Sequence, residues 1–296
     1  MRDLSNFTAK EWLRLLPLQH ALKQVRNDVF LAIYKKIRPK ALQSFLTETQ
    51  KLKGKNIALI IAFEQPWALD WLLRMAQRNL IDATVLVFDN SRRAAARIDI
   101  ERVCRDHGVP YLGLPANPTR HANRSHGMAM TWVFYNVVRA IQPRMFAFLD
   151  HDLIPVKKIA LAERLAGQPF FGKVKVKEWG WHLWAGYCMY DFPFVAGLPL
   201  NFLYDFSQEL DTGGRNWNCL YRQYDRQQLR LAESEFMTVM DAITAEPRSV
   251  EVVDHSWFHI SAIGYNDGFR SKRQFCERLA LGLDQGKSWS DLLKQG

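Results

Sequence analysis

The sequence predicts an α/β protein whose central sheet is mostly parallel and carries helices on both faces. Between residues 56 and 149, four short apolar runs alternate with segments of helical periodicity. Such alternation of strand and helix is typical of parallel sheets, because each parallel connection needs a crossover. The chain has 296 residues, of which 48% are hydrophobic and 24% charged, and this suits a globular protein with a large core.

Residues 1–54 are expected to form a basic helical extension. Apolar residues recur at every third or fourth position of 18–37, which is the spacing of one helical face, and Pro39 ends the pattern. Residues 1–55 hold twelve Lys/Arg and four Asp/Glu, so most of the formal net charge of +10 lies there. Two interpretations stay open. The helix packs on the main domain with a solvated basic face, or residues 18–40 lie on an anionic membrane surface.

The elements that follow are predicted in order along the chain. Strands are expected at 56–63, 83–88, 111–114 and 145–149, and helices from Pro66, around 94–106, and from Asn123 or Ser125 to about 141. After Pro155 the alternation stops. Strands are expected within 170–190, a helix near 231–244, a last strand at 249–253 and a polar helical tail from about 266. We therefore expect a main domain over 55–265 and a helical tail over 266–296.

Composition argues against several classes of protein. No apolar run reaches the roughly 18–20 residues of a membrane span, and the N-terminus lacks the apolar stretch of a secretion signal. The four cysteines are scattered without a CxxC pair, so reduced thiols are expected rather than disulfides or a zinc site. These features predict a cytoplasmic protein, which would be peripheral on the inner face of the membrane if residues 18–40 bind lipid.

Two carboxylates stand at the end of the fourth predicted strand. Asp150 and Asp152 flank His151 after the run MFAFL, and Asp89 ends the second strand. Ligands of parallel sheets bind outside the carboxyl ends of the strands, so these side chains are expected to face one crevice. A solvated turn would explain a single Asp. A pair at the tip of a buried strand suits Mg²⁺ or Mn²⁺, which leave room for phosphate oxygens.

Five stretches within residues 57–261 resemble the glycosyltransferases of the GT-A fold, closest in style to family 2. They are strand 57–63 with the Glu that follows it, VLVFDNS (85–91), NRSHGMAMTWVFYN (123–136), FLDHDLIP (148–155) and WFHIS (257–261). FLDHDLIP matches the DxD motif of the family, although a central His is unusual. The resemblance implies that the nucleotide-sugar contacts Glu64, Asp89, Arg124 and Asp150, and that the metal is held by Asp150, Asp152 and His259.

The resemblance also implies an acceptor site and a base. WHLWAGYCMYDF (181–192) is similar to the acceptor-side segment, in which Gly186 would allow a close approach and aromatic residues such as Trp184 and Trp217 would line a sugar site. Core packing is the alternative for each Trp. An inverting enzyme needs a general base, for which SQELDTGGRNW (207–217) offers Asp211 or its rival Glu209. Either could instead be an ordinary loop acid, and inversion or retention stays open.

The expected function is metal-dependent transfer of one sugar from a nucleotide-diphosphate sugar to a glycan or lipid-linked acceptor, as in surface polysaccharide synthesis of the bacterial type. Mn²⁺ or Mg²⁺ would be the cofactor. The QxxRW signature of processive members is absent, since Gln227 follows Arg226. The alternatives are a basic nucleic-acid-binding protein, or a phosphatase or nucleotidyltransferase that uses the same Asp pair. Nucleic acid is not expected as a partner, because basic and aromatic residues are not interleaved on a strand platform.

Overall fold

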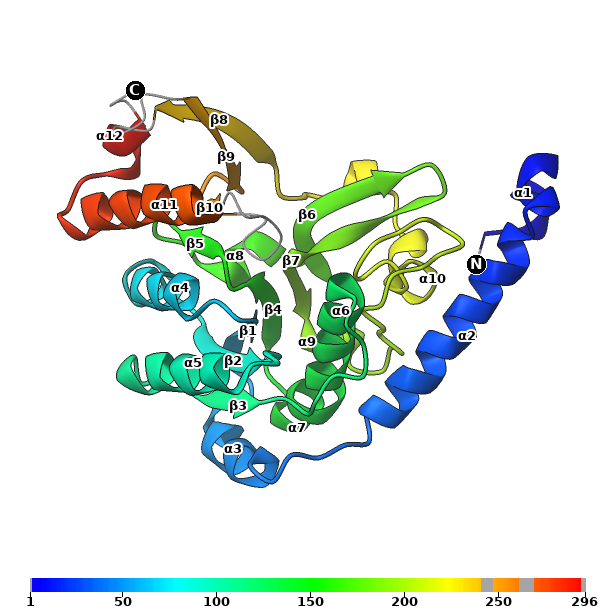
Figure 1. Cartoon of the computed structure of the whole chain (residues 1–296), viewed down its shortest axis with the longest axis horizontal. Helices are drawn as coiled ribbons and strands as arrows, with labels where there is room; N and C mark the ends of the chain where they lie inside the picture. Colours follow the sequence, from blue (N-terminus) through cyan, green and yellow to red (C-terminus); the bar gives the residue numbers. More distant parts are fainter. Residues whose placement is uncertain (1, 241–246, 261–268, 294–296) are drawn as a thin grey trace.

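A six-stranded sheet forms the centre of the computed structural model, which describes residues 2–240, 247–260 and 269–293 (Figure 1). The strand order is β3-β2-β1-β4-β7-β6. The first four of these strands run parallel, and β7 and β6 are antiparallel to their neighbours. The bounds are β1 Asn56–Ala62, β2 Thr84–Asp89, β3 Tyr111–Gly113, β4 Met145–Asp150, β6 Phe170–Lys177 and β7 Gly180–Asp191. The predicted fold class, an α/β protein with a mostly parallel sheet, is confirmed.

Helices cover both faces of this sheet. The connections contain α4 (Pro66–Asn79), α5 (Ala94–Asp106) and α6 (Ala122–Val133), which continues through a π-helical turn at Phe134–Val138 into α7 (Arg139–Ile141). Successive side chains of β1 point to opposite faces: Ala58 and Ile60 pack in the core under α4, and Ile57 and Leu59 in the core under α6. Both faces of the sheet are therefore buried, which explains why its parallel strands are continuous apolar runs in the sequence.

A second sheet brings a late segment of the chain to the end of β4. It has the order β5-β10-β9-β8, with bounds β5 Leu153–Pro155, β8 Ser234–Met240, β9 Pro247–Val253 and β10 Trp257–His259. Strand β5 begins three residues after β4 ends, and β10 pairs with it antiparallel. The C-terminal helices α11 (Phe269–Asp284) and α12 (Trp289–Leu293) contribute to the core that contains Trp257 and Phe258. The helical tail predicted from about residue 266 is confirmed where the structure describes it.

The helix predicted near 231–244 is wrong, because residues 234–240 form strand β8. Its backbone pairs with β9 from Ser234 opposite Val253 to Met240 opposite Pro247. The partner lies later in the chain, and local propensity gives no sign of such pairing. The start of α6 also differs slightly from the prediction, since its N-cap is His121 rather than Asn123 or Ser125.

The N-terminal extension consists of helices, as predicted. Its main helix is α2 (Leu16–Tyr34), preceded by α1 (Ala9–Leu13) and followed by α3 (Leu42–Thr49), and Figure 1 shows α2 at one edge of the molecule. The remaining short helices are α8 Leu161–Leu165, α9 Phe192–Val195 and α10 Asn216–Cys219, with 3₁₀ turns at Leu4–Asn6, Gln50–Leu52, Tyr221–Gln223 and Arg226–Gln228. Among the described residues, no helix is both long enough and apolar enough to span a bilayer.

Candidate metal and nucleotide site

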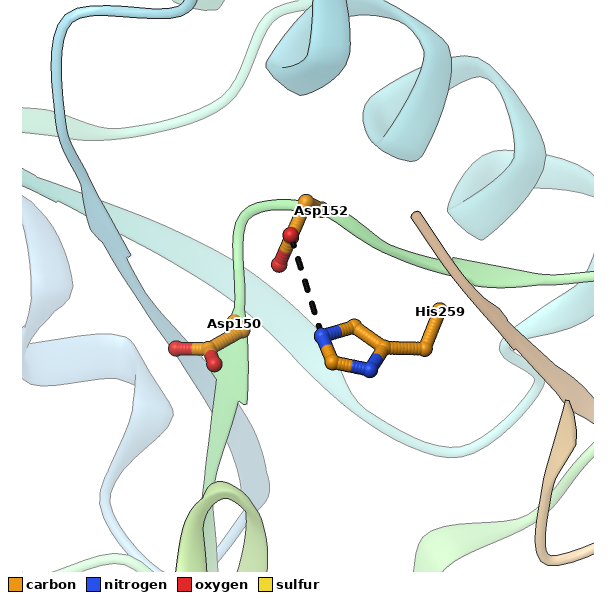
Figure 2. A group of neighbouring side chains, drawn as sticks. All are labelled: Asp150, Asp152 and His259. Atoms are coloured by element: carbon orange, nitrogen blue, oxygen red, sulfur yellow. Dashed lines mark ion pairs between the residues drawn. The ribbon is translucent and has the colours of Figure 1, made fainter. Parts of the chain in front are cut away.

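Three predicted metal ligands converge at the carboxyl end of the parallel sheet. Asp150 is the last residue of β4, Asp152 lies in the turn before β5, and His259 ends β10. Because β10 pairs with β5, His259 stands opposite Leu153 and beside the Asp pair. One ligand atom from each of the three residues lies within 4.8 Å of the other two. Figure 2 shows Asp152 and His259 pointing toward each other, with Asp150 beside them.

The imidazole of His259 is oriented by a residue that the sequence did not indicate. Its Nδ1 lies 2.8 Å from Oε2 of Glu251 on β9, and its Nε2 lies 3.7 Å from Oδ2 of Asp152. Glu251 also forms an ion pair with Lys173. A neutral His259 that donates from Nδ1 to Glu251 presents the lone pair of Nε2 to the site, which is the arrangement found around metal-bound histidines.

Charges around His259 and Glu251 favour their ionised forms in the absence of a cation. Burial disfavours protonation of His259, but the Glu251 hydrogen bond and the Asp152 charge outweigh it and raise the pKa of His259. Burial likewise raises the pKa of Glu251, but hydrogen bonds from His259 and Lys173 prevail and lower it to about 2. A divalent cation at Nε2 would replace the proton of His259.

The surroundings of Asp150 disfavour the charged form of its carboxylate. Burial raises the pKa of Asp150, and the nearby His126 opposes this rise, with Nε2 3.6 Å from Oδ1 of Asp150. His126 itself has a pKa lowered by burial. His126 is not among the residues predicted from the sequence, although it lies in the NRSHGM stretch one turn into α6. A partly buried carboxylate with a raised pKa next to a second carboxylate is a position where a bound cation would be stabilising.

The donor set fits the predicted cofactor. Carboxylate oxygens suit both Mg²⁺ and Mn²⁺, and a single imidazole is accepted more readily by Mn²⁺. Only three protein ligands converge among the described residues, which leaves room for phosphate oxygens and water. The Asp-Asp-His group could therefore hold Mn²⁺ or Mg²⁺.

Glu251→Gln is expected to weaken Mn²⁺ binding about 10- to 100-fold, because it removes the charge that orients and polarises His259. Titration of Mn²⁺ followed by electron paramagnetic resonance measures the affinity directly. Glu235→Gln is the matched control, since Glu235 lies on the neighbouring strand β8 and contacts His255 instead. Equal Mn²⁺ affinity in Glu251→Gln and the wild type would show that Glu251 has no part in the site.

A cavity of about 630 Å³ opens beside the three ligands. All three line it, together with His126. Cationic side chains from three separate parts of the chain also line it: Arg92, Arg120, Lys175 and Lys177. Walls of this charge suit an anionic ligand such as a diphosphate. These cations could not be predicted from the sequence, because no local pattern shows that the loops after β2 and β3 and the β6–β7 hairpin meet.

The residues predicted for the acceptor site lie in two different places, beside the metal ligands and outside the cavity. Trp184 lines the cavity. The centroid of its ring lies 4.7 Å from the centroid of the His259 ring and 4.9 Å from Nζ of Lys173. A Cβ at Gly186 would overlap the Asp150 carboxylate and the Trp184 ring. The close approach that Gly186 permits is therefore made by two side chains of the site itself. Trp217 packs instead against Trp181 and Gly180, outside the cavity lining.

The two candidate bases also differ in position. Asp211 is exposed and lines the cavity, and its Oδ1 accepts hydrogen bonds from Nδ2 of Asn123 (2.9 Å) and the backbone N–H of Thr212 (2.7 Å). Glu209 is exposed, has a φ of 57° and lies outside the cavity lining. The geometry favours Asp211, while both catalytic roles stay predictions.

Three predicted nucleotide contacts have partners within the protein. Asp89 is fully buried and accepts hydrogen bonds from Ser91 N–H (2.8 Å) and Tyr111 O–H (3.0 Å). Glu64, with a φ of 60°, accepts from the backbone N–H groups of Arg92 and Arg93. Arg124 donates to the Tyr204 hydroxyl. All three lie outside the cavity lining, and their contacts with a nucleotide stay predictions.

Acid is expected to destabilise the protein through His182, a buried residue of the cavity wall. Burial lowers the pKa of His182 to about 4, whereas an unfolded His titrates near 6.5. Between these values the unfolded chain binds the extra proton. The contribution of neutral His182 to the free energy of unfolding is therefore complete above pH 6.5. About 3 kcal/mol of it is lost as the pH falls toward 4. Urea unfolding at pH 7, 5 and 4 should show a shallower loss in His182→Gln, and equal slopes would contradict this prediction.

Comparison with known proteins finds only partial similarity to solved structures. No family model and no curated protein matches the sequence. Among solved structures, the chain is similar to the bifunctional glycosyltransferase WbbM in its apo form, with a TM-score of 0.34 and 11% identity over 48% of this chain and 32% of that one.

Two further solved structures are similar over parts of their length. The mannosyltransferase PcManGT from Pyrobaculum calidifontis, in complex with GDP-Man and Mn²⁺, has a TM-score of 0.37 and 12% identity over 65% of this chain and 61% of that one. Glucosyl-3-phosphoglycerate synthase from Mycobacterium tuberculosis, with Mn²⁺ and UDP-glucose, has a TM-score of 0.29 and 14% identity over 46% and 49%. The chain thus spans less than two thirds of each of these proteins, and the similarity concerns the arrangement of strands and helices.

Proposed function

We propose that this protein is a metal-dependent glycosyltransferase of the GT-A type, which moves a single sugar from a nucleotide-diphosphate sugar to an acceptor hydroxyl. The observation that carries the proposal is the convergence of Asp150, Asp152 and His259 at the carboxyl end of a parallel sheet, on the wall of a cationic cavity. A hard cation and an anionic diphosphate are the ligands that such a site suits.

The donor would bind with its diphosphate between the metal ligands and the basic wall. Asp150, Asp152 and Nε2 of His259 would hold Mn²⁺ or Mg²⁺, which when bound stabilises the negative charge on a leaving diphosphate. Lys175 and Lys177 line the same cavity and would offset the negative charge of the diphosphate that the metal leaves unneutralised. Glu64, Asp89 and Arg124 are proposed as the nucleotide end of the site.

The acceptor hydroxyl would be activated by Asp211. Asp211 would take the proton of the hydroxyl while its oxygen bonds to the anomeric carbon, and the bond from that carbon to the diphosphate oxygen would break with its electron pair on the oxygen. The hydrogen bonds from Asn123 and Thr212 hold the carboxylate of Asp211 in place. Glu209 is the alternative base. Trp184, Gly186 and Trp217 are proposed for the acceptor side.

We also propose an acceptor class, a cellular location and a domain division for this enzyme. The acceptor would be a glycan or a lipid-linked glycan in polysaccharide synthesis, and the enzyme would act in the cytoplasm. Residues 55–265 would form the catalytic domain, between the basic extension 1–54 and the tail 266–296.

Thermal unfolding in the presence of nucleotides tests the proposal. A ligand that binds only the native state raises the melting temperature. We expect a rise with one of UDP, GDP or CMP, and only when Mn²⁺ is also present. No rise with any nucleotide, with or without Mn²⁺, would contradict a nucleotide-sugar site. A salt-sensitive shift with DNA or RNA that needs no metal would favour the nucleic-acid alternative.

A further inference from the structure

The apolar face of α2 points away from the protein. Leu22 is 71% exposed, Val25 61% and Ile33 58%. With the other exposed members of the same face they form what we call the outer stripe: Leu18, Leu22, Val25, Val29 and Ile33. The stripe follows the spacing of one helical face and covers about 22 Å of helix. The face marked by the apolar periodicity is therefore exposed to solvent, and α2 contacts the main domain through another face.

The opposite face holds α2 in this orientation. Asn27, Leu31 and Tyr34 are buried, and the Tyr34 hydroxyl donates to the carbonyl of Pro115 at 3.2 Å. Arg215 forms an ion pair with Asp28 and donates to the carbonyl of Gln24. Turning the outer stripe inward would break all of these contacts. The exposure of the stripe is thus fixed by packing.

Positive charge surrounds the outer stripe and is not neutralised. Residues 10–40 contain eight Lys/Arg and only two acids, Glu11 and Asp28. Both acids are already in ion pairs, with Arg2 and Arg215. Arg14, Arg26 and Lys36 are exposed and have no ion pair within the described residues. The face therefore offers apolar side chains and unneutralised cations together.

We propose that the outer stripe docks α2 flat on an anionic phospholipid surface. Apolar side chains on one face with cations at its edges are what a helix needs to lie in a membrane interface. On α1, the helix that precedes α2, Trp12 (40% exposed) and Leu13 (86%) are further exposed apolar side chains. A second copy of the chain fits less well as the partner, because two such faces would bring positive charges together without acidic residues to neutralise them. This inference does not depend on the proposed glycosyl transfer.

Vesicle flotation of the full chain tests the docking. We expect binding to vesicles of phosphatidylcholine mixed with phosphatidylglycerol, with little binding to phosphatidylcholine alone. Leu22→Asn with Val29→Asn should weaken binding at least about tenfold, because two inserted side chains are lost. The matched control is Ile81→Asn with Ile98→Asn, two residues of similar exposure (63% and 64%) elsewhere on the surface, which should leave binding unchanged.

The charge contribution is tested separately. Arg26→Gln with Lys36→Gln should weaken binding to the anionic vesicles about tenfold or more and reduce its salt dependence. Equal binding to neutral and anionic vesicles would overturn the proposal, as would no binding to either. Sedimentation velocity tests the alternative that the outer stripe binds a second copy of the chain. A wild-type dimer that Leu22→Asn/Val29→Asn converts to a monomer, without vesicle binding, would assign the stripe to a second copy.

Discussion

Asp152→Asn is expected to abolish Mn²⁺-dependent stabilisation by nucleotide and to reduce sugar transfer by about 10³-fold. The side chain of Asp152 is 10% exposed and faces Nε2 of His259 across 3.7 Å, so it is well placed to share a cation with that nitrogen. Asparagine keeps the shape but removes the negative charge. Loss of one group that stabilises a developing charge costs about 10²–10³ in rate, and loss of the cation adds to this.

The fold should survive this substitution, because the turn is held by backbone. The carbonyl of Asp152 accepts from the N–H of Ile260, and this bond does not involve the side chain. The melting temperature without ligands should therefore stay close to that of the wild type. Asp99→Asn, on the exposed surface of α5, serves as the control and should keep both metal dependence and activity. Full transfer activity in Asp152→Asn would reject the Asp pair as the metal site.

Gly127→Ala is expected to destabilise the protein by about 2–3 kcal/mol. A Cβ at this position of α6 would overlap the carbonyl oxygen of Phe202 and come within 3.0 Å of its carbon. Both atoms belong to the backbone, so the segment or the helix must move. Replacing Gly by Ala inside a helix normally stabilises by about 1 kcal/mol, but overpacking a dense core costs about 1–3 kcal/mol or more. We expect the steric cost to dominate.

Urea unfolding measures this effect, and Gly197→Ala is its control. A Cβ at Gly197 would meet nothing within 4 Å, and the residue has no positive φ that alanine would resist. The control should be neutral or slightly stabilising, because alanine restricts the unfolded chain. Unchanged stability in Gly127→Ala would mean that α6 and the Phe202 segment are not in close contact.

Elements whose signals are local could be predicted from the sequence. The four parallel strands, the helices between them and the end of β4 at the Asp pair agree with the structure within a few residues. Strand β8 could not be predicted, because its hydrogen bonds go to β9, which comes later in the chain. The orientation of α2 could not be predicted either, since periodicity defines an apolar face but not what covers it.

The sequence by itself determined the parallel sheet and the presence of two carboxylates at the tip of a buried strand, because both follow from short-range periodicity and from the common direction of parallel strands. Tertiary structure decided how other groups reach those carboxylates. His259, which the resemblance had implied, and Glu251, which had not been predicted, reach the site through the pairing of β10 with β5 and β9, and Lys175 and Asp211 line the cavity from other parts of the chain. Contacts between residues this distant in sequence depend on the packing of whole elements, for which no short segment carries a signal.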